Sequence, residues 1–194
     1  MKEQLLTSVS EYMRTGIHIG TKFRTKFMHN FIYKIRNDKL SILNIGKIDE
    51  RLKIASCFMS GYEPTDVIMV CKRENGWKAV KSFSYYTGIK SITKYKSGTL
   101  TNMSLECFIE ARLLIAVDGF LDFNAIRDAS RIGIPIIALC DSNNKPNFID
   151  LVVPCNNKGG RSLGLIFYLL AQEYLKLRGI QKEINRDDFI AESP

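Results

Sequence analysis

Short apolar runs separated by amphipathic stretches dominate the chain after its first third. The runs are rich in β-branched residues, and the strands they predict lie at 66–71, 89–95, 113–117, 134–140 and 150–153, the second being the weakest. Helical spacing of apolar residues predicts helices at 76–86, 123–131 and 162–178. Strands that are apolar throughout and alternate with helices are typical of a parallel sheet covered on both faces. The pattern therefore predicts a doubly wound, three-layer α/β/α domain.

The first third of the chain has a different pattern. A rough apolar stripe predicts a short helix over residues 2–13. Two strands are expected at 31–36 and 40–45, and an Asn-Asp turn between them makes a hairpin. Asp49 is expected to cap a helix that runs to about Ser60.

The size and apolar content of the chain indicate one domain. With 194 residues, 45% of them hydrophobic, the chain is long enough to bury a core. We expect a single domain over 1–194, with an N-terminal helix and basic loop at 1–30, an α/β core at about 31–179 and a polar tail at 180–194. The tail is expected to be loose or docked on a partner.

Charge changes this picture most. The chain has 28 basic residues against 20 acidic ones, a formal net charge of +8 and a pI near 9.3. The excess is concentrated, because residues 1–48 hold nine bases and three acids and residues 72–96 hold seven bases and one acid. Such an excess favours a polyanionic partner, either nucleic acid or an anionic membrane surface.

The most basic stretch runs from Met13 to Asp38 and has no acidic residue before its last position. Glycines loosen its backbone, and aromatic residues lie between its cations. Cations bind phosphate, whereas aromatic rings either anchor a segment to a core or stack on bases. The stretch is therefore either an extended loop that lies against a polyanion or a solvated connector whose aromatic rings pack into the core.

Several protein classes are disfavoured by what the sequence lacks. Its five cysteines form no CxxC motif and lie mostly in apolar runs, which fits packing in a reducing cytosol. The N-terminal residues have no apolar core of signal-peptide length. No apolar run reaches about 18 residues, so we expect no membrane span.

Phosphate-binding motifs are weak. The segment GIHIGTK (16–22) lacks the ending and glycine spacing of a P-loop. The segment PCNNKGGRSLG (154–164) lies between a predicted strand and a predicted helix, where backbone N–H groups cradle anions in other proteins. It does not match GxGxxG, so nucleotide binding is weighed there against an ordinary turn.

Two carboxylates keep an enzyme hypothesis open. Asp118 and Asp141 each follow an apolar strand directly, where a magnesium-dependent phosphotransfer enzyme would place metal ligands. Each is equally well explained as a turn former or a helix cap. No serine or cysteine in the sequence stands in a recognisable nucleophile motif that could pair with His18 or His29 as a general base. Trp77 is expected either to pack in the core or to stack on a base. We expect no catalytic residue, no metal and no cofactor.

Six segments in a fixed order carry a family resemblance that spans about residues 12–178. They are GIHIGT (16–21), FIY with Arg36 and Asp38 (31–38), DER (49–51), GTLTN (98–102), IP with ALCD (134–141), and DL through VPCNNK with SL (150–163). In these segments the chain resembles the universal second protein of the small ribosomal subunit, in its archaeal and eukaryotic form, a family that includes the laminin-receptor precursor. Three local departures are Ser97, Glu110-Ala111-Arg112 and Asp118-Gly119, where relatives usually have a proline.

The resemblance implies a fold and a role. It implies a flavodoxin-like core and a structural constituent of the small ribosomal subunit, on the solvent side where head meets body. Such a protein binds ribosomal RNA and neighbouring ribosomal proteins during assembly and translation. The resemblance also implies a cytoplasmic, ribosomal location without catalysis, cofactor, small-molecule substrate or membrane contact. Short loops leave no room for the coiled coil of the bacterial form, and the long acidic tail of the eukaryotic form is missing, so an archaeal source is expected.

The residues expected to contact RNA come from three segments. They are His18, Lys22, Arg24, Lys26, Lys34 and Arg36 from the basic stretch, Thr101 and Asn102 from the GTLTN loop, and Asn156, Asn157, Lys158 and Arg161 from the turn before the last helix. Phe23 or Phe27 is expected to stack on a base, dock in a neighbouring protein or anchor in the core. The basic loop is expected to be disordered until RNA neutralises it. The alternatives to a ribosomal protein are the phosphotransfer enzyme and an RNA-binding module that acts off the ribosome.

Overall fold

A parallel five-stranded sheet lies at the centre of the computed structural model, which describes residues 5–190. The strands are β3 (Val67–Val70), β4 (Lys90–Ile92), β5 (Leu113–Ala116), β6 (Ile136–Cys140) and β7 (Leu151–Pro154). Their order in the sheet is β4-β3-β5-β6-β7, and every neighbouring pair is parallel. This is the flavodoxin-like strand order. All five strands expected from the apolar runs are present.

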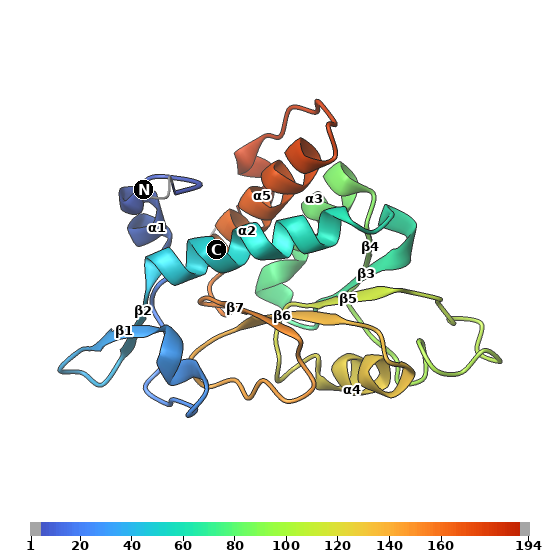
Figure 1. The fold of residues 1–194 in the computed structure, drawn as a ribbon, viewed down its shortest axis with the longest axis horizontal. Helices are drawn as coiled ribbons and strands as arrows, with labels where there is room; N and C mark the ends of the chain where they lie inside the picture. The colour runs from blue at the N-terminus through green and yellow to red at the C-terminus, as the bar shows by residue number, and fades with distance from the viewer. Residues whose placement is uncertain (1–4, 191–194) are drawn as a thin grey trace.

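Helices cover both faces of this sheet, so the predicted three-layer fold is confirmed (Figure 1). The helices α2 (Ile45–Ser60), α3 (Trp77–Thr87) and α5 (Gly160–Leu177) lie on one face. Helix α4 (Phe123–Ile132) lies on the other face and contacts β5 and β6. Every residue of β3, β5 and β6 is buried, which explains why these strands are apolar throughout.

A loop takes the place of a helix between β4 and β5. Residues 93–112 return along the α4 face, where the backbone N–H of Gly98 (2.9 Å) and the hydroxyl of Tyr95 (3.1 Å) donate to the Asp128 carboxylate of α4. Asp128 is buried, and these two hydrogen bonds hold the 93–112 loop against α4 although the loop contains no helix. Short 3-10 helices complete the element order: η1 (Met28–Phe31), η2 (Pro64–Asp66), η3 (Glu74–Gly76) and η4 (Arg186–Phe189).

The N-terminal part forms a short helix and the expected hairpin. Helix α1 spans Val9–Thr15, shorter than predicted, and residues 2–4 of the predicted helix lie outside the described residues. Gly16 ends α1 in the left-handed conformation, with φ of 71°. Strands β1 (Ile32–Ile35) and β2 (Ser41–Leu43) pair antiparallel.

The start of α2 differs from the prediction. The Asn44 side chain accepts hydrogen bonds from the backbone N–H groups of Gly46 (2.9 Å) and Lys47 (3.4 Å), so the helix begins before Asp49. The prediction that Asp49 caps this helix is therefore wrong, because the last residues of the expected strand already belong to the helix and its cap.

Asp49 instead joins two helices. Its carboxylate is buried within α2 and accepts hydrogen bonds from the Tyr12 hydroxyl and the Leu6 backbone N–H, both at 2.8 Å. Lys53, one turn later, forms an ion pair with it at 2.8 Å. Burial and the hydrogen bond to Asp49 raise the pKa of the Tyr12 phenol. This cluster fastens α1 to the body of the protein.

The polar tail packs against its own chain. Phe189 of η4 is fully buried, with its ring stacked on Tyr86 of α3 at 5.6 Å and edge-on to Tyr168 of α5 at 6.0 Å. The Ser82 hydroxyl donates to the Asp188 carbonyl at 2.7 Å. The expectation of a loose or partner-bound tail is therefore wrong up to residue 190, and residues 191–194 lie outside the described residues.

Candidate nucleic-acid interface

The basic loop, residues 16–30, begins as a partner of the hairpin. The backbone N–H of Gly20 donates to Ser41 at 2.8 Å, and the N–H of Ser41 donates back to Thr21 at 3.1 Å. The N–H of Leu43 donates to His18 at 2.8 Å, and Ile19 forms an antiparallel bridge with Ile42. The first part of the loop therefore lies along the edge of β2.

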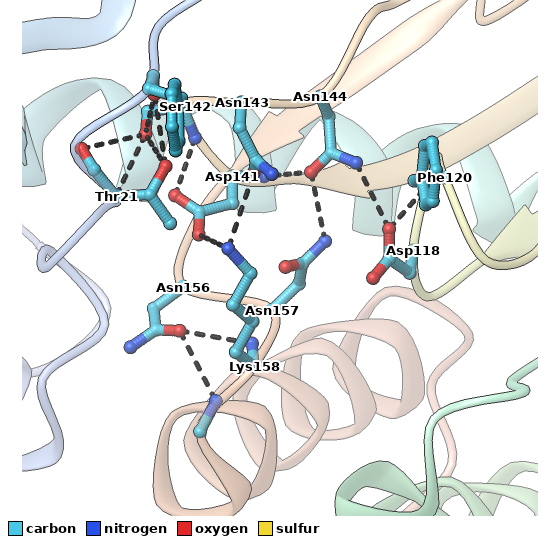
Figure 2. Close-up of polar contacts among 12 residues, drawn as sticks. Thr21, Asp118, Phe120, Asp141, Ser142, Asn143, Asn144, Asn156, Asn157 and Lys158 are labelled. Atoms are coloured by element: carbon cyan, nitrogen blue, oxygen red, sulfur yellow. Dashed lines mark hydrogen bonds and ion pairs between the residues drawn. The ribbon is translucent and has the colours of Figure 1, made fainter.

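The second part of the loop is fastened to the segment that follows β6. The Ser142 hydroxyl accepts from the backbone N–H of Thr21 at 2.9 Å and lies 3.0 Å from the carbonyl of Phe23 (Figure 2). The backbone N–H of Thr25 donates to the Ser142 carbonyl, and its hydroxyl donates to the Asn144 carbonyl, both at 3.0 Å. These bonds argue against the expectation that the loop is disordered without RNA, because they fix its backbone within the chain.

A glycine is required where the loop passes over this segment. A Cβ atom on Gly20 would lie 3.0 Å from both the Asp141 Oδ1 and the Ser142 Oγ atoms. Such contacts are shorter than van der Waals distance, and the backbone amide of Gly20 is already bonded to Ser41. A side chain at position 20 would therefore require Asp141 and Ser142 to shift by a few tenths of an ångström.

The loop presents its cations and aromatic rings to solvent. Lys22, Arg24 and Lys26 are exposed, and within residues 5–190 no acidic side chain forms an ion pair with any of them. Phe23 is 79% exposed and Phe27 44% exposed. Phe23 is therefore not a core anchor, a role that Met28 and Phe31 fill instead.

The hairpin adds two cations next to the loop. Lys34 of β1 is exposed, and Arg36 is paired with Asp38 at 3.3 Å on the surface. His18 is only partly exposed, and its Nδ1 atom is buried without a hydrogen-bond partner among the described residues. Lys34 and Arg36 are therefore accessible to a partner, whereas His18 presents only part of its ring.

Asp118 is held within a network of its own chain at the carboxyl ends of the strands. Its carboxylate accepts hydrogen bonds from the Phe120 backbone N–H at 2.8 Å and the Asn144 side chain at 3.1 Å (Figure 2). It also forms an ion pair with Arg73. Asp118 is 2% exposed. The turn-forming explanation for Asp118 therefore holds, and its acceptor positions are taken by protein donors rather than left open for a metal.

Asp141 is occupied in the same way. It is 1% exposed, forms an ion pair with Lys158 at 3.1 Å and accepts the backbone N–H of Ser142 at 2.5 Å. Among residues 5–190 there is no group of three or more His, Cys, Asp or Glu side chains arranged to hold a metal ion. Both carboxylates therefore have partners within the protein, which favours the structural explanation over a phosphotransfer site.

Asp122 completes this network, although its sequence context gave no sign of it. It accepts hydrogen bonds from the backbone N–H groups of Lys72 and Asp118, both at 2.9 Å. Burial raises the pKa of the Asp122 carboxyl to about 7, against the lowering effect of these hydrogen bonds. Asp122 thus joins the loops after β3 and β5, where the strand order of the sheet reverses.

Two of the expected RNA contacts serve the turn instead. Asn157 is fully buried and donates to the Leu139 carbonyl and the Asn144 side chain, both at 3.2 Å, so the prediction that it contacts RNA is wrong. Asn156 accepts the backbone N–H groups of Lys158 (3.0 Å) and Gly159 (3.3 Å). A bound anion would need the backbone N–H groups of Lys158 and Gly159, and both already donate to the Asn156 side chain. This arrangement favours the ordinary turn over nucleotide binding.

The remaining predicted contacts lie in two places. Arg161 at the start of α5 is exposed, and the turn before it meets the basic loop, because the Asn156 backbone N–H donates to Ile17 at 2.8 Å. Thr101 and Asn102 are exposed on the 93–112 loop. Figure 1 shows this loop at the opposite end of the molecule from the hairpin, so the structure does not unite the GTLTN loop with the basic loop.

Trp77 and the cysteines have structural roles. Trp77 is partly buried, and its indole N–H donates to the Cys71 carbonyl at 3.1 Å. Cys71, Cys140 and Cys155 are buried without disulfides, and burial raises the pKa of the Cys71 thiol to about 12.

No helix within residues 5–190 has the length and apolar character to cross a membrane.

Comparison with known proteins gives a consistent result. The family model described as ribosomal protein S2 matches residues 109–176. The small ribosomal subunit protein uS2 of Thermoplasma acidophilum is 43% identical over 198 residues, covering 99% of this chain and 100% of the relative. The uS2 proteins of Picrophilus torridus and Nanoarchaeum equitans are each 44% identical, covering 97% and 90% of this chain and 98% and 88% of their own lengths.

Proposed function

The chain belongs to the ribosomal protein S2 family, of archaeal type, and we propose that its basic loop is the main contact with small-subunit ribosomal RNA. As a member of this family it is a structural constituent of the small ribosomal subunit, acts in cytoplasmic ribosomes and is not an enzyme. Its partners are the RNA and the proteins of that particle, and the proposal concerns which side chains meet the RNA.

The observation that carries the proposal is the combination of a fixed backbone with cations that have no acidic partner among residues 5–190. Lys22, Arg24 and Lys26 project from a loop whose backbone is bonded to the hairpin and to Ser142. A cation without an acidic neighbour gains most from a phosphate, because binding releases the counterions of the RNA. A fixed backbone also lowers the entropy lost when the side chains bind.

Other exposed or partly exposed side chains extend this contact, including Lys158, which is also paired with Asp141. Lys34, Arg36 and the exposed edge of His18 lie beside the loop, and Lys158 and Arg161 lie across the turn that bonds to Ile17. We assign them contacts to phosphate or sugar, which position a protein on folded RNA without reading its sequence. Thr101 and Asn102 form a separate contact, to a different part of the RNA or to a neighbouring ribosomal protein.

Charge reversal in the loop tests the proposal. The triple variant Lys22→Glu, Arg24→Glu, Lys26→Glu should bind small-subunit particles stripped of this protein on the order of 100-fold more weakly near physiological salt. The dependence of affinity on salt should become shallower, because about three phosphate contacts are lost. Thermal stability should change little, because all three side chains are exposed.

A matched control separates the loop from net charge. Lys90→Glu, Arg127→Glu, Arg131→Glu makes the same change in charge at three exposed positions on β4 and α4. This variant should keep most of its affinity. Equal weakening by the two variants, or wild-type binding by the loop variant, would contradict the proposal.

A further inference from the structure

We propose that the Phe23 ring is a stacking platform for an unpaired RNA base. This inference rests on the proposed function, because it names the chemical group that the same loop meets beyond phosphate. Aromatic side chains between cations are a common means of binding splayed-out nucleotides, since every base offers a π face and every phosphate a negative charge.

Hydrogen bonds hold the backbone at Phe23 and at Thr25, two residues further along the chain. The Phe23 carbonyl lies 3.0 Å from both the Thr21 and the Ser142 hydroxyls. Two residues further on, the backbone N–H of Thr25 donates to Ser142 and its hydroxyl to Asn144. The ring therefore stands out from an anchored segment, and a base that stacks on it does not have to order the loop first.

Exposure alone does not carry the inference, because single exposed apolar residues are common on protein surfaces. Phe120 is exposed to almost the same extent, 78% against 79% for Phe23. The two rings differ in their surroundings: Lys22 and Arg24 flank Phe23, whereas Gly119 and Leu121 flank Phe120. Phe120 is therefore an internal control with equal exposure and no neighbouring cation in the sequence.

The same surroundings favour RNA over a protein pocket as the partner of the ring. Protein interfaces place aromatic anchors in an apolar centre from which lysine is largely excluded. Phe23 has exposed cations at positions 22, 24 and 26. Further along the chain Phe27 is only partly exposed, at 44%, and Met28 and Phe31 are buried. A base attached to a phosphate matches a ring between cations better than an apolar pocket does.

The test compares Phe23→Ala with Phe120→Ala and Phe23→Tyr. Binding is measured to stripped small-subunit particles and to protein-free small-subunit RNA over a range of salt concentrations. Phe23→Ala should weaken both interactions by roughly 5- to 150-fold without changing the salt dependence, because a neutral ring releases no counterions. Phe120→Ala and Phe23→Tyr should bind within about twofold of the wild type. Phe120 has no neighbouring cation in the sequence, and Phe23→Tyr keeps an aromatic ring at position 23.

Three outcomes would overturn the inference. If Phe23→Ala binds like the wild type while the charge-reversed loop binds weakly, the loop contacts RNA through phosphates only and the Phe23 ring does not stack on a base. A defect of Phe23→Ala on particles but not on protein-free RNA would assign the ring to a neighbouring protein. If the charge-reversed loop also binds normally, the proposed function itself fails and the stacking fails with it.

Discussion

At the scale of single residues, Ser142 holds the basic loop against the segment that follows β6. Its side chain is fully buried, and its hydroxyl lies within hydrogen-bond distance of the Thr21 N–H, the Thr21 hydroxyl (2.8 Å) and the Phe23 carbonyl. No other described residue joins the segment after β6 to both sides of Lys22 in this way. The buried hydroxyl of Ser142 therefore contributes to the placement of the exposed cations, together with the backbone bonds to the hairpin.

Ser142→Ala should lower the free energy of unfolding by about 1–3 kcal/mol, because it leaves the Thr21 N–H without its buried acceptor and removes one of the two hydroxyls at the Phe23 carbonyl. Thermal denaturation and hydrogen exchange measure the effect, and the Thr21 and Thr25 amides should exchange faster. Ser104→Ala, at an exposed serine of the 93–112 loop, is the control and should change neither quantity. Unchanged protection of both amides in Ser142→Ala would show that the hydroxyl does not hold the loop.

Sequence alone did not reveal this contact. Thr21 and Ser142 lie 121 positions apart, and a serine followed by two asparagines is typical of any polar loop. The cations of the loop, in contrast, were predictable because charge is a property of each residue by itself. Asn157 was misassigned for the same reason as Ser142 was missed: a polar residue in a turn carries no local mark of whether it faces solvent or a buried carbonyl.

At the scale of elements, a helix or strand was predicted correctly where a few consecutive residues define it, and misplaced where a single side chain decides its start or its packing. The strands β3, β5 and β6 were found because every residue in them is buried and apolar, so a few consecutive residues define each one. The edge strand β4 has an exposed lysine at its first position and only partly buried residues after it, which explains why its sequence signal was the weakest. The start of α2 was misplaced because Asn44, at the end of an expected strand, is the true cap. The tail was misjudged because its buried aromatic anchor, Phe189, stands in a polar sequence.

Phe189→Ala should release the tail from α3 and α5. The ring is fully buried between Tyr86 and Tyr168, and removing a buried phenylalanine ring costs about 3–5 kcal/mol in a packed site. Limited proteolysis should then cut within residues 181–188 at protease concentrations that leave the wild type intact, and the melting temperature should fall. Ile180→Ala, at an exposed position, should remain resistant to cleavage. A resistant tail in Phe189→Ala would mean that other contacts hold it.

At the scale of the whole molecule, the chain fills the place where doubly wound proteins usually bind a ligand. The carboxyl ends of the strands are occupied by Asp118, Asp122 and Asp141 with their protein partners, and the basic loop lies over the end of β6. The fold is thus used as a scaffold that presents a basic loop, which agrees with a structural role in the ribosome.

The folded chain also brings together part of the charge that is scattered along the sequence. The turn at 156–161 bonds to Ile17, and Arg186 of the tail forms an ion pair with Glu11 of α1, so the basic N-terminal and C-terminal segments meet. The GTLTN loop lies at the other end of the molecule (Figure 1). The predicted RNA-contact residues of this loop are therefore separate from those of the basic loop on the folded chain.

The most direct test of the central claim is sedimentation of native cell lysate through sucrose gradients at moderate and at high salt, with quantification of this protein in each fraction. We predict that the protein migrates with the small ribosomal subunit at both salt concentrations, at close to one copy per particle. Recovery only at the top of the gradient at both concentrations would contradict the ribosomal role. Association with RNA that disappears at moderate salt would contradict it as well, because it would indicate a loose RNA-binding protein rather than a constituent of the particle.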